Sequence, residues 1–393
     1  MFTFRRARRA AALQGEAHRT TSSAAAEPIR IGWMSSLTGA LSSAAIAENQ
    51  GVQFAVDELN QAGGIGGRKI ELVTRDTGGD PTKAVNFAKQ LVFSDKVQFI
   101  IGPVNSGESL ATVPIVATAG VPNLVIGTLD ELIDPKKYPR AFRVINTNRQ
   151  WVEAANDYAL RVLKKKRVAL IGDTSGYGTA TAKMAAELLE KAGVKPVYSV
   201  LVDPNKTDVS DEMNKAKEAG ADVIMPWSAA TGLLARLLNA RGDMGWNVVV
   251  VGHPAMMASP LRKLLGKPAY WENAFAAGYS STTYDAEGRL PERTKALVDR
   301  LRPKLGGSEI DYMFWWVAIG YDTVKIIEHA VKTAGSTDPA AIQKALESTR
   351  ELKGVYATYA WSPEQHNGFP DHNIVINIAS TFKDGSFKAA PIK

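Results

Sequence analysis

The sequence predicts an α/β protein of two doubly wound lobes. Short, apolar, β-rich runs alternate with helical stretches from Ile29 onward, and the same alternation begins again at Arg167. Alternation of this kind predicts a mainly parallel sheet with helices on both faces. The chain has 393 residues, 45% of them hydrophobic, which is enough for two cores. Two successive α/β units of similar size therefore indicate a two-lobed protein.

The first unit has clear start and stop signals. Gly63-Gly64 predicts the end of its first helix, and Asp80-Pro81 predicts the start of its second. The predicted strands are Ile29–Met34, Lys69–Thr74, Val97–Ile101 and Val121–Ile126. The predicted helices are Ala44–Ala62, Thr82–Phe93 and Ser106–Ala119.

The second unit repeats this pattern, and a mixed segment follows it. Its predicted strands are Arg167–Ile171, Val197–Val202, Val223–Pro226 and Val248–Val251, and its helices are Tyr177–Ala192, Val209–Ala219 and Thr231–Arg241. After a strand-like run, Ala274–Tyr279, come helices at Glu292–Leu305, Ile310–Thr333 and Pro339–Ser348, then β-rich pieces at Val355–Ala360 and Asn373–Ala379. This last segment either forms a third small unit or completes both lobes.

Residues 1–26 do not belong to the predicted fold. They combine a basic opening, Arg5 to Arg9, with Ala24-Ala25-Ala26, as a secretory leader does, but polar residues such as Gln14 and Glu16 interrupt the apolar middle. One interpretation is a leader, which implies a periplasmic protein. The other is a disordered tail, which leaves a cytoplasmic location open. The folded protein is expected to begin near Pro28.

The charge balance argues against nucleic-acid binding. The formal net charge is +7, but five arginines against Glu16 place +4 of it in residues 1–26. The remaining +3 contains a single basic run, Lys164–Arg167. The absence of cysteine removes disulfides, thiolate metal sites and cysteine nucleophiles.

The sequence contains no pattern that predicts catalysis or a cofactor. It lacks the G-x-G-x-x-G, G-K-[ST] and G-x-S-x-G motifs. His366 and His372 lie in a loop without the spacing of a zinc site and are predicted to be surface residues. We therefore expect no enzyme, no metal and no cofactor.

Three loops at predicted strand ends indicate a binding cleft. They are Gly102–Ser109, Gly127–Asp130 and Gly172–Gly178, and all are rich in small and hydroxyl residues. Ligands of open α/β sheets bind beyond the carboxyl ends of the strands, and the start of a helix suits an anion such as a carboxylate. Because the loops come from both units, they predict a cleft that closes on a small polar ligand.

An aromatic cluster at Met313–Trp316 lies on a predicted helix. Its helical spacing favours core packing. The alternative is that one ring reaches the cleft or a docking surface.

The order of these motifs resembles the substrate-binding proteins of ABC importers, of the branched-chain amino-acid (leucine/isoleucine/valine) type. The resemblance covers Pro28 to Lys393 and rests on Ile29–Gly39, Gly51–Gly64, Gly66–Lys69, Asp76–Pro81, Ile101–Pro103 with Ser106, and Tyr177-Gly178. It implies a type I periplasmic binding protein, in which three hinge crossovers, near Asn146, Tyr279 and Gly354, join the lobes. The N-terminal lobe would then be 28–146 plus 279–354, and the C-terminal lobe 147–278 plus 355–393.

The resemblance also implies a function and a set of ligand-binding residues. Such proteins are not enzymes; they deliver a ligand to permease subunits in the membrane. A ligand carboxylate would meet Ser106, Gly107, Ile126 and Thr128 through hydroxyls and backbone N–H groups. Tyr177 would reach the cleft from the second lobe. The alternative function is a cytoplasmic ligand-sensing regulator on the same fold.

The chain departs from the family pattern where the ammonium group of an amino acid is held. Amino-acid binders of the family place a glutamate after the strand predicted at Val248–Val251, and this chain has His253 there instead. Two aromatic positions of the family fall on Ala44 and Ala229, with Trp227 nearby as a possible stacking face. A carboxylate retained, an acid lost and a wider pocket predict an organic acid, for instance an aromatic one, in place of a branched-chain amino acid.

Overall fold

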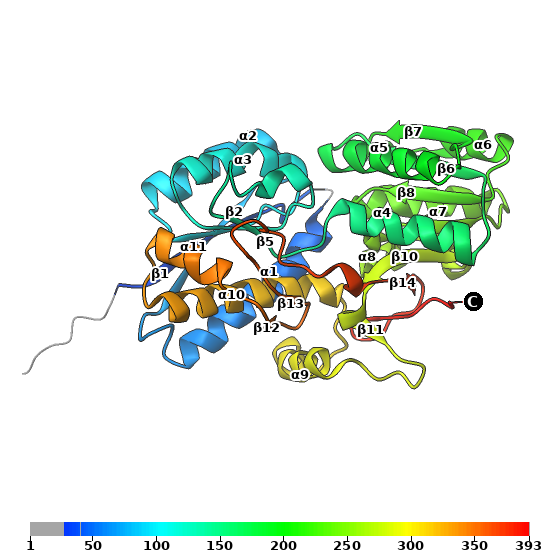
Figure 1. The fold of residues 1–393 in the computed structure, drawn as a ribbon. Coiled ribbons are helices and arrows are strands. Elements are labelled where there is room, and N and C mark those ends of the chain that lie inside the picture. Colours follow the sequence, from blue (N-terminus) through cyan, green and yellow to red (C-terminus); the bar gives the residue numbers. More distant parts are fainter. Residues whose placement is uncertain (1–26, 40, 393) are drawn as a thin grey trace, which may run out of the picture.

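The first lobe is built on a five-stranded parallel sheet. The computed structural model describes residues 27–39 and 41–392, and Figure 1 shows two lobes lying side by side. The strand order is β2-β1-β3-β4-β5. The strands are β1 (Ile29–Ser35), β2 (Ile70–Asp76), β3 (Phe99–Ile101), β4 (Asn123–Val125) and β5 (Ala141–Arg143). The helices of this lobe are α1 (Ser42–Gln61), α2 (Pro81–Lys89), α3 (Ser106–Thr118), α10 (Phe314–Ala334) and α11 (Pro339–Glu347).

Helices α1 and α10 pack with their backbones in contact. A Cβ atom added to Gly51 would lie 1.9 Å from the carbonyl oxygen of Val317, and one added to Gly320 would lie 2.1 Å from that of Glu48. Only glycine permits this approach. The close crossing joins a helix near the start of the chain to one from its last third, which completes the first lobe.

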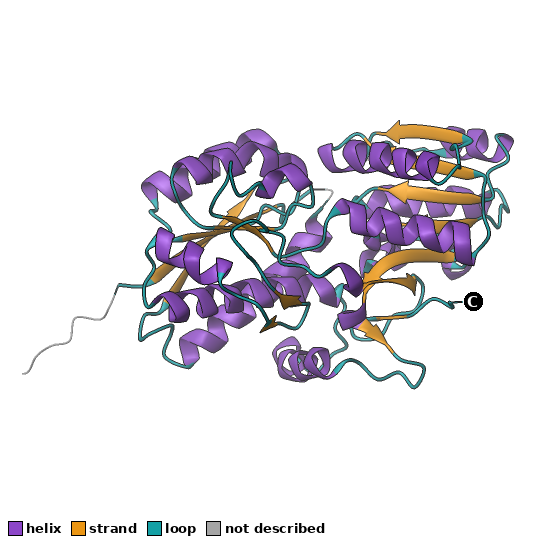
Figure 2. Ribbon diagram, in the orientation of Figure 1, coloured by secondary structure: helices purple, strands orange, loops and turns teal. Residues whose placement is uncertain are grey.

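The second lobe is a six-stranded, mostly parallel sheet between two layers of helices (Figure 2). Its order is β14-β10-β9-β8-β6-β7, with only β14 antiparallel to its neighbour. The strands are β6 (Val168–Asp173), β7 (Tyr198–Val202), β8 (Val223–Trp227), β9 (Val249–Gly252), β10 (Ala274–Tyr279) and β14 (Ile374–Ile378). The helices are α4 (Asn148–Asp157), α5 (Gly176–Lys191), α6 (Ser210–Glu218), α7 (Thr231–Asp243) and α8 (Ser259–Leu264).

Smaller elements complete the chain. Helix α9 (Glu292–Leu301) lies below the junction of the lobes in Figure 1. Strand β11 (Thr283–Tyr284) pairs with β15 (Phe387–Lys388), and β12 (Leu352–Lys353) pairs with β13 (Thr358–Tyr359). Within the described residues, no helix combines the length and apolar character that a membrane span requires.

The predicted fold class, two doubly wound α/β lobes, is confirmed. Strand β10 has the predicted bounds, α3 differs from its prediction by one residue at its end, and α5 differs by one residue at each end. Asp80 caps α2 as predicted, with its carboxylate accepting from the backbone nitrogens of Thr82 and Lys83. Strand β5 and helices α4 and α8 were not predicted.

The chain crosses between the lobes three times. The first crossing runs from β5 to α4 through Asn146, and the second follows β10, which ends at Tyr279. The third lies between Phe369, which is buried against Tyr356, and Ile374, where β14 begins. The sequence-based expectation placed this last crossing near Gly354.

Residues 355–369, expected in the second lobe, pack on the first. The indole nitrogen of Trp361 donates to the carbonyl of Arg143 at 3.2 Å, and the ring of His366 stacks on Phe142 with centroids 4.1 Å apart. The carboxylate of Asp322 in α10 accepts from the backbone nitrogens of Val355 and Tyr356. Buried aromatic rings therefore hold this segment in the first lobe, and His366, predicted on the surface, is 1% exposed.

Candidate ligand-binding site

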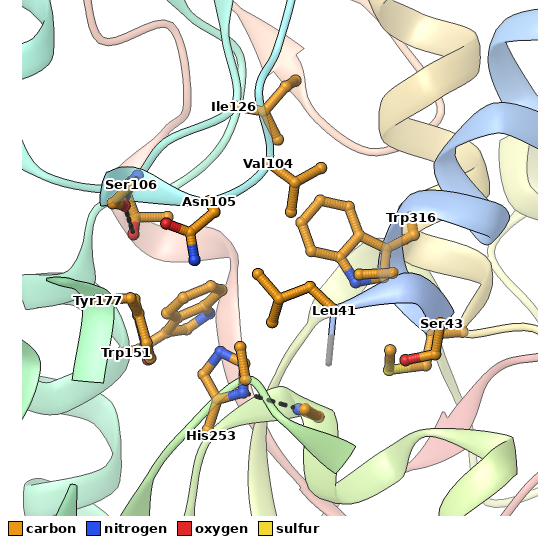
Figure 3. Close-up of a pocket in the computed structure, with 15 residues that line it drawn as sticks. Leu41, Ser43, Val104, Asn105, Ser106, Ile126, Trp151, Tyr177, His253 and Trp316 are labelled. Atoms are coloured by element: carbon orange, nitrogen blue, oxygen red, sulfur yellow. Dashed lines mark hydrogen bonds between the residues drawn. The ribbon is translucent and has the colours of Figure 1, made fainter. Parts of the chain in front are cut away.

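A pocket lies between the lobes, beyond the carboxyl ends of strands from both sheets (Figure 3). The residues that line it are Leu41, Ser43, Ala44, Val104, Asn105, Ser106, Ile126, Thr128, Trp151, Tyr177, Ala229, His253, Ala255, Met313 and Trp316.

Neutral hydrogen-bond donors gather at one end of the pocket, where α3 begins. Asn105 caps the helix, because its side-chain oxygen accepts from the backbone nitrogen of Gly107 at 2.7 Å. Its amide nitrogen is turned toward the pocket (Figure 3). Ser106 Oγ accepts from the backbone nitrogen of Thr128 at 3.1 Å, and the two hydroxyl oxygens lie 3.4 Å apart. Donors at the positive end of a helix dipole suit a carboxylate.

Three aromatic rings form the wall on the side of the second lobe. The ring centroid of His253 lies 5.0 Å from those of Trp151 and Tyr177, and the Trp151 and Tyr177 centroids are 6.3 Å apart. All three contacts are edge-to-face, the favourable geometry for aromatic pairs. Their exposed fractions are 5% or less, so a ligand would meet a rigid wall.

His253 is a neutral hydrogen-bond donor. Its Nδ1 accepts from the backbone nitrogen of Ala255 at 3.0 Å, so its single proton lies on Nε2. Burial lowers the pKa of His253 from 6.5 to about 3, which keeps the imidazole uncharged at neutral pH.

Tyr177 supplies a second polar group on this wall. Its hydroxyl is buried and has no hydrogen-bond partner among the described residues. Burial raises the pKa of Tyr177 well above its ordinary value, so the hydroxyl stays protonated. A buried, unpaired hydroxyl beside a pocket is ready to bond to a ligand.

The other walls are apolar. Leu41, Val104 and Ile126 face the pocket from the first lobe, as does the indole of Trp316 (Figure 3). Trp316 belongs to the predicted aromatic cluster, so the alternative that one of these rings reaches the cleft is confirmed. Ala229 adds a small side chain from the second lobe.

Five of the seven candidate residues line the pocket: Ser106, Ile126, Thr128, Tyr177 and His253. Gly107 does not, because its backbone nitrogen donates to Asn105 and it faces Gly176, whose added Cβ would lie 3.3 Å from the Cα atom of Gly107. Trp227 is also placed elsewhere, in the core with 0% exposure.

Sequence reasoning missed Trp151 because it missed α4. This helix begins with a capping box, in which Thr147 and Gln150 bond to each other's backbone nitrogen. The pattern Thr-x-x-Gln was the signal that could have revealed the helix. Trp151 and Val152 follow it as the first buried apolar pair.

Every residue that lines the pocket in the described part of the chain is uncharged. The acids that could substitute for a missing glutamate are engaged elsewhere. Asp76 bonds to Thr38, and Asp173 accepts from Ser228 at 2.5 Å. Asp130 pairs with the buried Arg143. The described residues also contain no cluster of three or more histidine or acidic side chains that could hold a metal ion.

The lobes touch each other at the edges of the pocket. The hydroxyls of Ser43, at the start of α1, and Thr231, at the start of α7, are 3.2 Å apart. Gly107 and Gly176 meet at the starts of α3 and α5. The two lobes are therefore in contact with each other beside the pocket.

Two α/β lobes closed over a small, uncharged pocket define a bilobal ligand-binding protein. A family described as "Periplasmic binding protein" matches residues 28–377, and the chain belongs to this family. The resemblance to its type I, branched-chain amino-acid group is confirmed by the relatives that follow.

Among relatives, the chain is 28% identical to the Leu/Ile/Val-binding protein homolog 3 of Brucella melitensis, over 90% of this chain and 92% of that one. It is 27% identical to an amino acid binding protein of Pseudomonas aeruginosa, over 76% and 77% of the two chains.

Solved structures give the same fold. The branched-chain amino acid transporter substrate binding protein LivJ of Streptococcus pneumoniae, in complex with isoleucine, matches with a TM-score of 0.79 and 25% identity, over 93% of this chain and 99% of that one. An ABC transporter solute binding protein of Rhodopseudomonas palustris, in complex with 4-hydroxybenzoate, has a TM-score of 0.75 and 20% identity, over 93% and 96%. The second likeness concerns the fold alone.

Proposed function

We propose that the protein is the extracytoplasmic solute receptor of an ABC importer, and that its ligand is an organic acid with an apolar or aromatic body and no ammonium group. The observation that carries the ligand class is the lining of the pocket, which offers neutral donors and apolar walls but no acid in the described residues. We expect the lobes to part for the ligand to enter and to close on it, and the receptor releases the ligand unchanged.

The polar end of the pocket supports a carboxylate. Ser106 and Thr128 offer hydroxyl donors, and Asn105 offers an amide N–H at the start of α3. Hydrogen bonds to a charged acceptor are stronger than those between neutral groups. A carboxylate can therefore be held here without a cationic side chain.

The opposite wall argues against an ammonium group. Enclosing an unpaired charge is costly, and the imidazole of His253 is uncharged. Its Nε2 carries a proton, so it donates and cannot accept from N–H groups of a ligand. On this wall the hydroxyl of Tyr177 is the only side-chain acceptor among the described lining residues, and it is a weak replacement for a carboxylate. The alternating rings and aliphatic side chains instead suit a flat, apolar body.

Relatives support the transport role. LivJ is by its title the substrate binding protein of a branched-chain amino acid transporter. A receptor of this kind works with permease subunits in the membrane. Residues 1–26, which carry the leader-like pattern, lie outside the described residues. Amino-terminal sequencing of protein from the native host tests the location: a mature start near Glu27 supports it, and an intact Met1 on cytoplasmic protein supports the regulator.

Calorimetry with matched pairs of ligands tests the ligand class. Leucine and 4-methylpentanoate share a carbon skeleton and differ in the amino group, as do phenylalanine and 3-phenylpropanoate. We expect the acids without the amino group, and benzoate with them, to bind more tightly than the amino acids. Tight binding of leucine, isoleucine or valine with no response to the other acids would contradict the proposal.

A further inference from the structure

Residues from two of the three crossings, and one from the segment that leads to the third, meet at one buried amide, the side chain of Asn146. The hydroxyl of Tyr279 donates to Asn146 Oδ1 at 2.9 Å, and the hydroxyl of Tyr356 donates to the same atom at 3.2 Å. Asn146 Nδ2 donates to the carbonyl of Thr147 at 2.8 Å, which turns Oδ1 toward the tyrosines. Asn146, Tyr279 and Tyr356 all have 0% exposure.

Two of these residues lie at crossings, and the third precedes one. Asn146 lies in the first, and Tyr279 is the last residue of β10, where the second begins. Tyr356 lies in the segment that leads to the third, and its ring centroid is 5.0 Å from that of Phe369. A rotation of one lobe against the other turns the chain at the first two crossings, so we expect it to strain the bonds that join Asn146, Tyr279 and Tyr356.

The same cluster reaches the ligand pocket from both lobes. Trp151, in the wall on the side of the second lobe, donates from Nε1 to the hydroxyl oxygen of Tyr279 at 3.0 Å. Trp316, in the wall of the first lobe, lies 4.3 Å from Trp315 between ring centroids, and Trp315 lies 5.0 Å from Tyr279. Tyr279 is thus bonded to one wall and connected through Trp315 to the other, although it does not line the pocket itself.

We propose that Asn146 and Tyr279 are positioning residues, which couple contact of a ligand with Trp151 to closure of the lobes. A tyrosine hydroxyl has one proton. Once that proton is donated to Asn146, the oxygen is oriented to accept from Trp151. Correct placement of the indole therefore depends on the hinge, and a ligand packed against the indole stabilises the hinge arrangement of the closed form.

These hydrogen bonds favour two distinct states, formed and broken, because their donors and acceptors are fully buried. Breaking one of them leaves a desolvated donor or acceptor without a partner, which costs more than the bond itself contributes. Of the proposed function, the inference requires only one part, which is that the lobes close on a ligand. It does not require the ligand to be an aromatic acid.

Spin-label distances measure closure directly in this chain. It contains no cysteine, so Lys89→Cys at the end of α2 and Lys191→Cys at the end of α5 would carry the only labels, one exposed position on each lobe. The probe is benzoate, and leucine is used in the same way if calorimetry shows that leucine binds. Wild-type lobes are expected to shift toward the short distance at saturation. If neither probe moves them, there is no closure to couple and the inference fails together with the proposed closure.

The decisive variant is Tyr279→Phe, which keeps the ring and the pocket walls but removes the hydroxyl. We expect about a tenfold weaker affinity for the probe, which is the loss of one to two neutral hydrogen bonds, and a smaller closed fraction at saturation. Tyr321→Phe is the matched control, since it removes a tyrosine hydroxyl bonded to Glu58 on the first lobe, away from the hinge. Wild-type affinity and closure in Tyr279→Phe would overturn the inference. If this variant does not fold, Tyr356→Phe removes one donor to Asn146 and is read in the same way.

A double variant that combines Trp151→Phe with Tyr279→Phe separates coupling between these two residues from a simple loss of stability. Trp151→Phe and Tyr279→Phe remove the same bond, so their effects on affinity should not add. We expect the double variant to bind at least threefold more tightly than the product of the single losses predicts. Full additivity would mean that Trp151 and Tyr279 act independently, which contradicts the proposal.

Discussion

Glu48 should make the protein less stable as the pH rises, and Glu48→Gln should remove that dependence. Glu48 lies in α1 with 0% exposure. Its Oε1 accepts from the indole nitrogen of Trp33 at 3.0 Å, and its Oε2 lies 3.5 Å from the hydroxyl of Ser35. Burial raises the pKa of Glu48 from 4.5 to about 8, an effect that these two hydrogen bonds only partly offset.

The size of the effect follows from the two pKa values. Between pH 4.5 and about 8 the folded protein holds a proton on Glu48 that the unfolded chain has released. The free energy of unfolding therefore falls by about 1.4 kcal/mol for each pH unit in this window. Between about pH 5 and about pH 8 this single group would remove about 4 kcal/mol of stability. A glutamine stays neutral, can accept from Trp33 and can donate to Ser35.

Urea unfolding at about pH 5, 6.5 and 8 measures this difference. Wild type and Glu48→Gln should have similar stability at the lowest pH, and the variant should be more stable by a growing margin as the pH rises. Asp57→Asn, on the exposed face of the same helix, is the control and should follow wild type. If the curves for Glu48→Gln and wild type stay parallel, the buried carboxyl does not titrate in this window and the predicted cause is wrong.

Four further variants and one control test the pocket and the packing around it. Ser106→Ala and Thr128→Val should each weaken binding of benzoate about ten- to a hundredfold in calorimetry, since each loses a bond to a charged group; unchanged affinity in both would place the carboxylate elsewhere. Tyr177→Phe should lower the affinity for 4-hydroxybenzoate more than that for benzoate, and equal losses would show that its hydroxyl does not meet the far end of the ligand. Gly51→Ala should destabilise the protein by about 2 kcal/mol or more in urea unfolding, because the new methyl group would meet a carbonyl oxygen of α10. Gly232→Ala, where the nearest atom is the end of a flexible arginine, should be close to neutral.

Local sequence patterns were sufficient to predict those elements that contain their own signals, such as an apolar run or a helix cap. Strand β10, an apolar run, has the predicted bounds, and α2 starts at its predicted cap. Helix α4 was missed although it carries a capping box, because the polar residues Asn148, Arg149 and Gln150 conceal its short apolar face. Because α4 was not predicted, Trp151 was left out of the predicted site.

Tertiary contacts decided what local patterns could not. The third crossing follows Phe369 because Asp322, on a helix more than 30 residues earlier, accepts hydrogen bonds from the backbone of residues 355 and 356. Neither Asp322 nor the run Val355–Ala360 indicates this pairing by itself. The resemblance led to three crossings, but their positions depend on which lobe buries these aromatic residues.

The placement of Trp227 could have been predicted from the strand that carries it. Side chains alternate between the two faces of a strand, so Val223, Met225 and Trp227 must share one face of β8. Val223 and Met225 are apolar strand residues whose face is expected to be core. In the structure these three belong to one buried cluster, and Ile224 belongs to the other. Treating Trp227 as part of the loop after the strand hid this relation, since a loop residue has no fixed face. The pocket accordingly receives the small Ala229 from this loop, and its aromatic wall comes from Trp151, Tyr177 and His253.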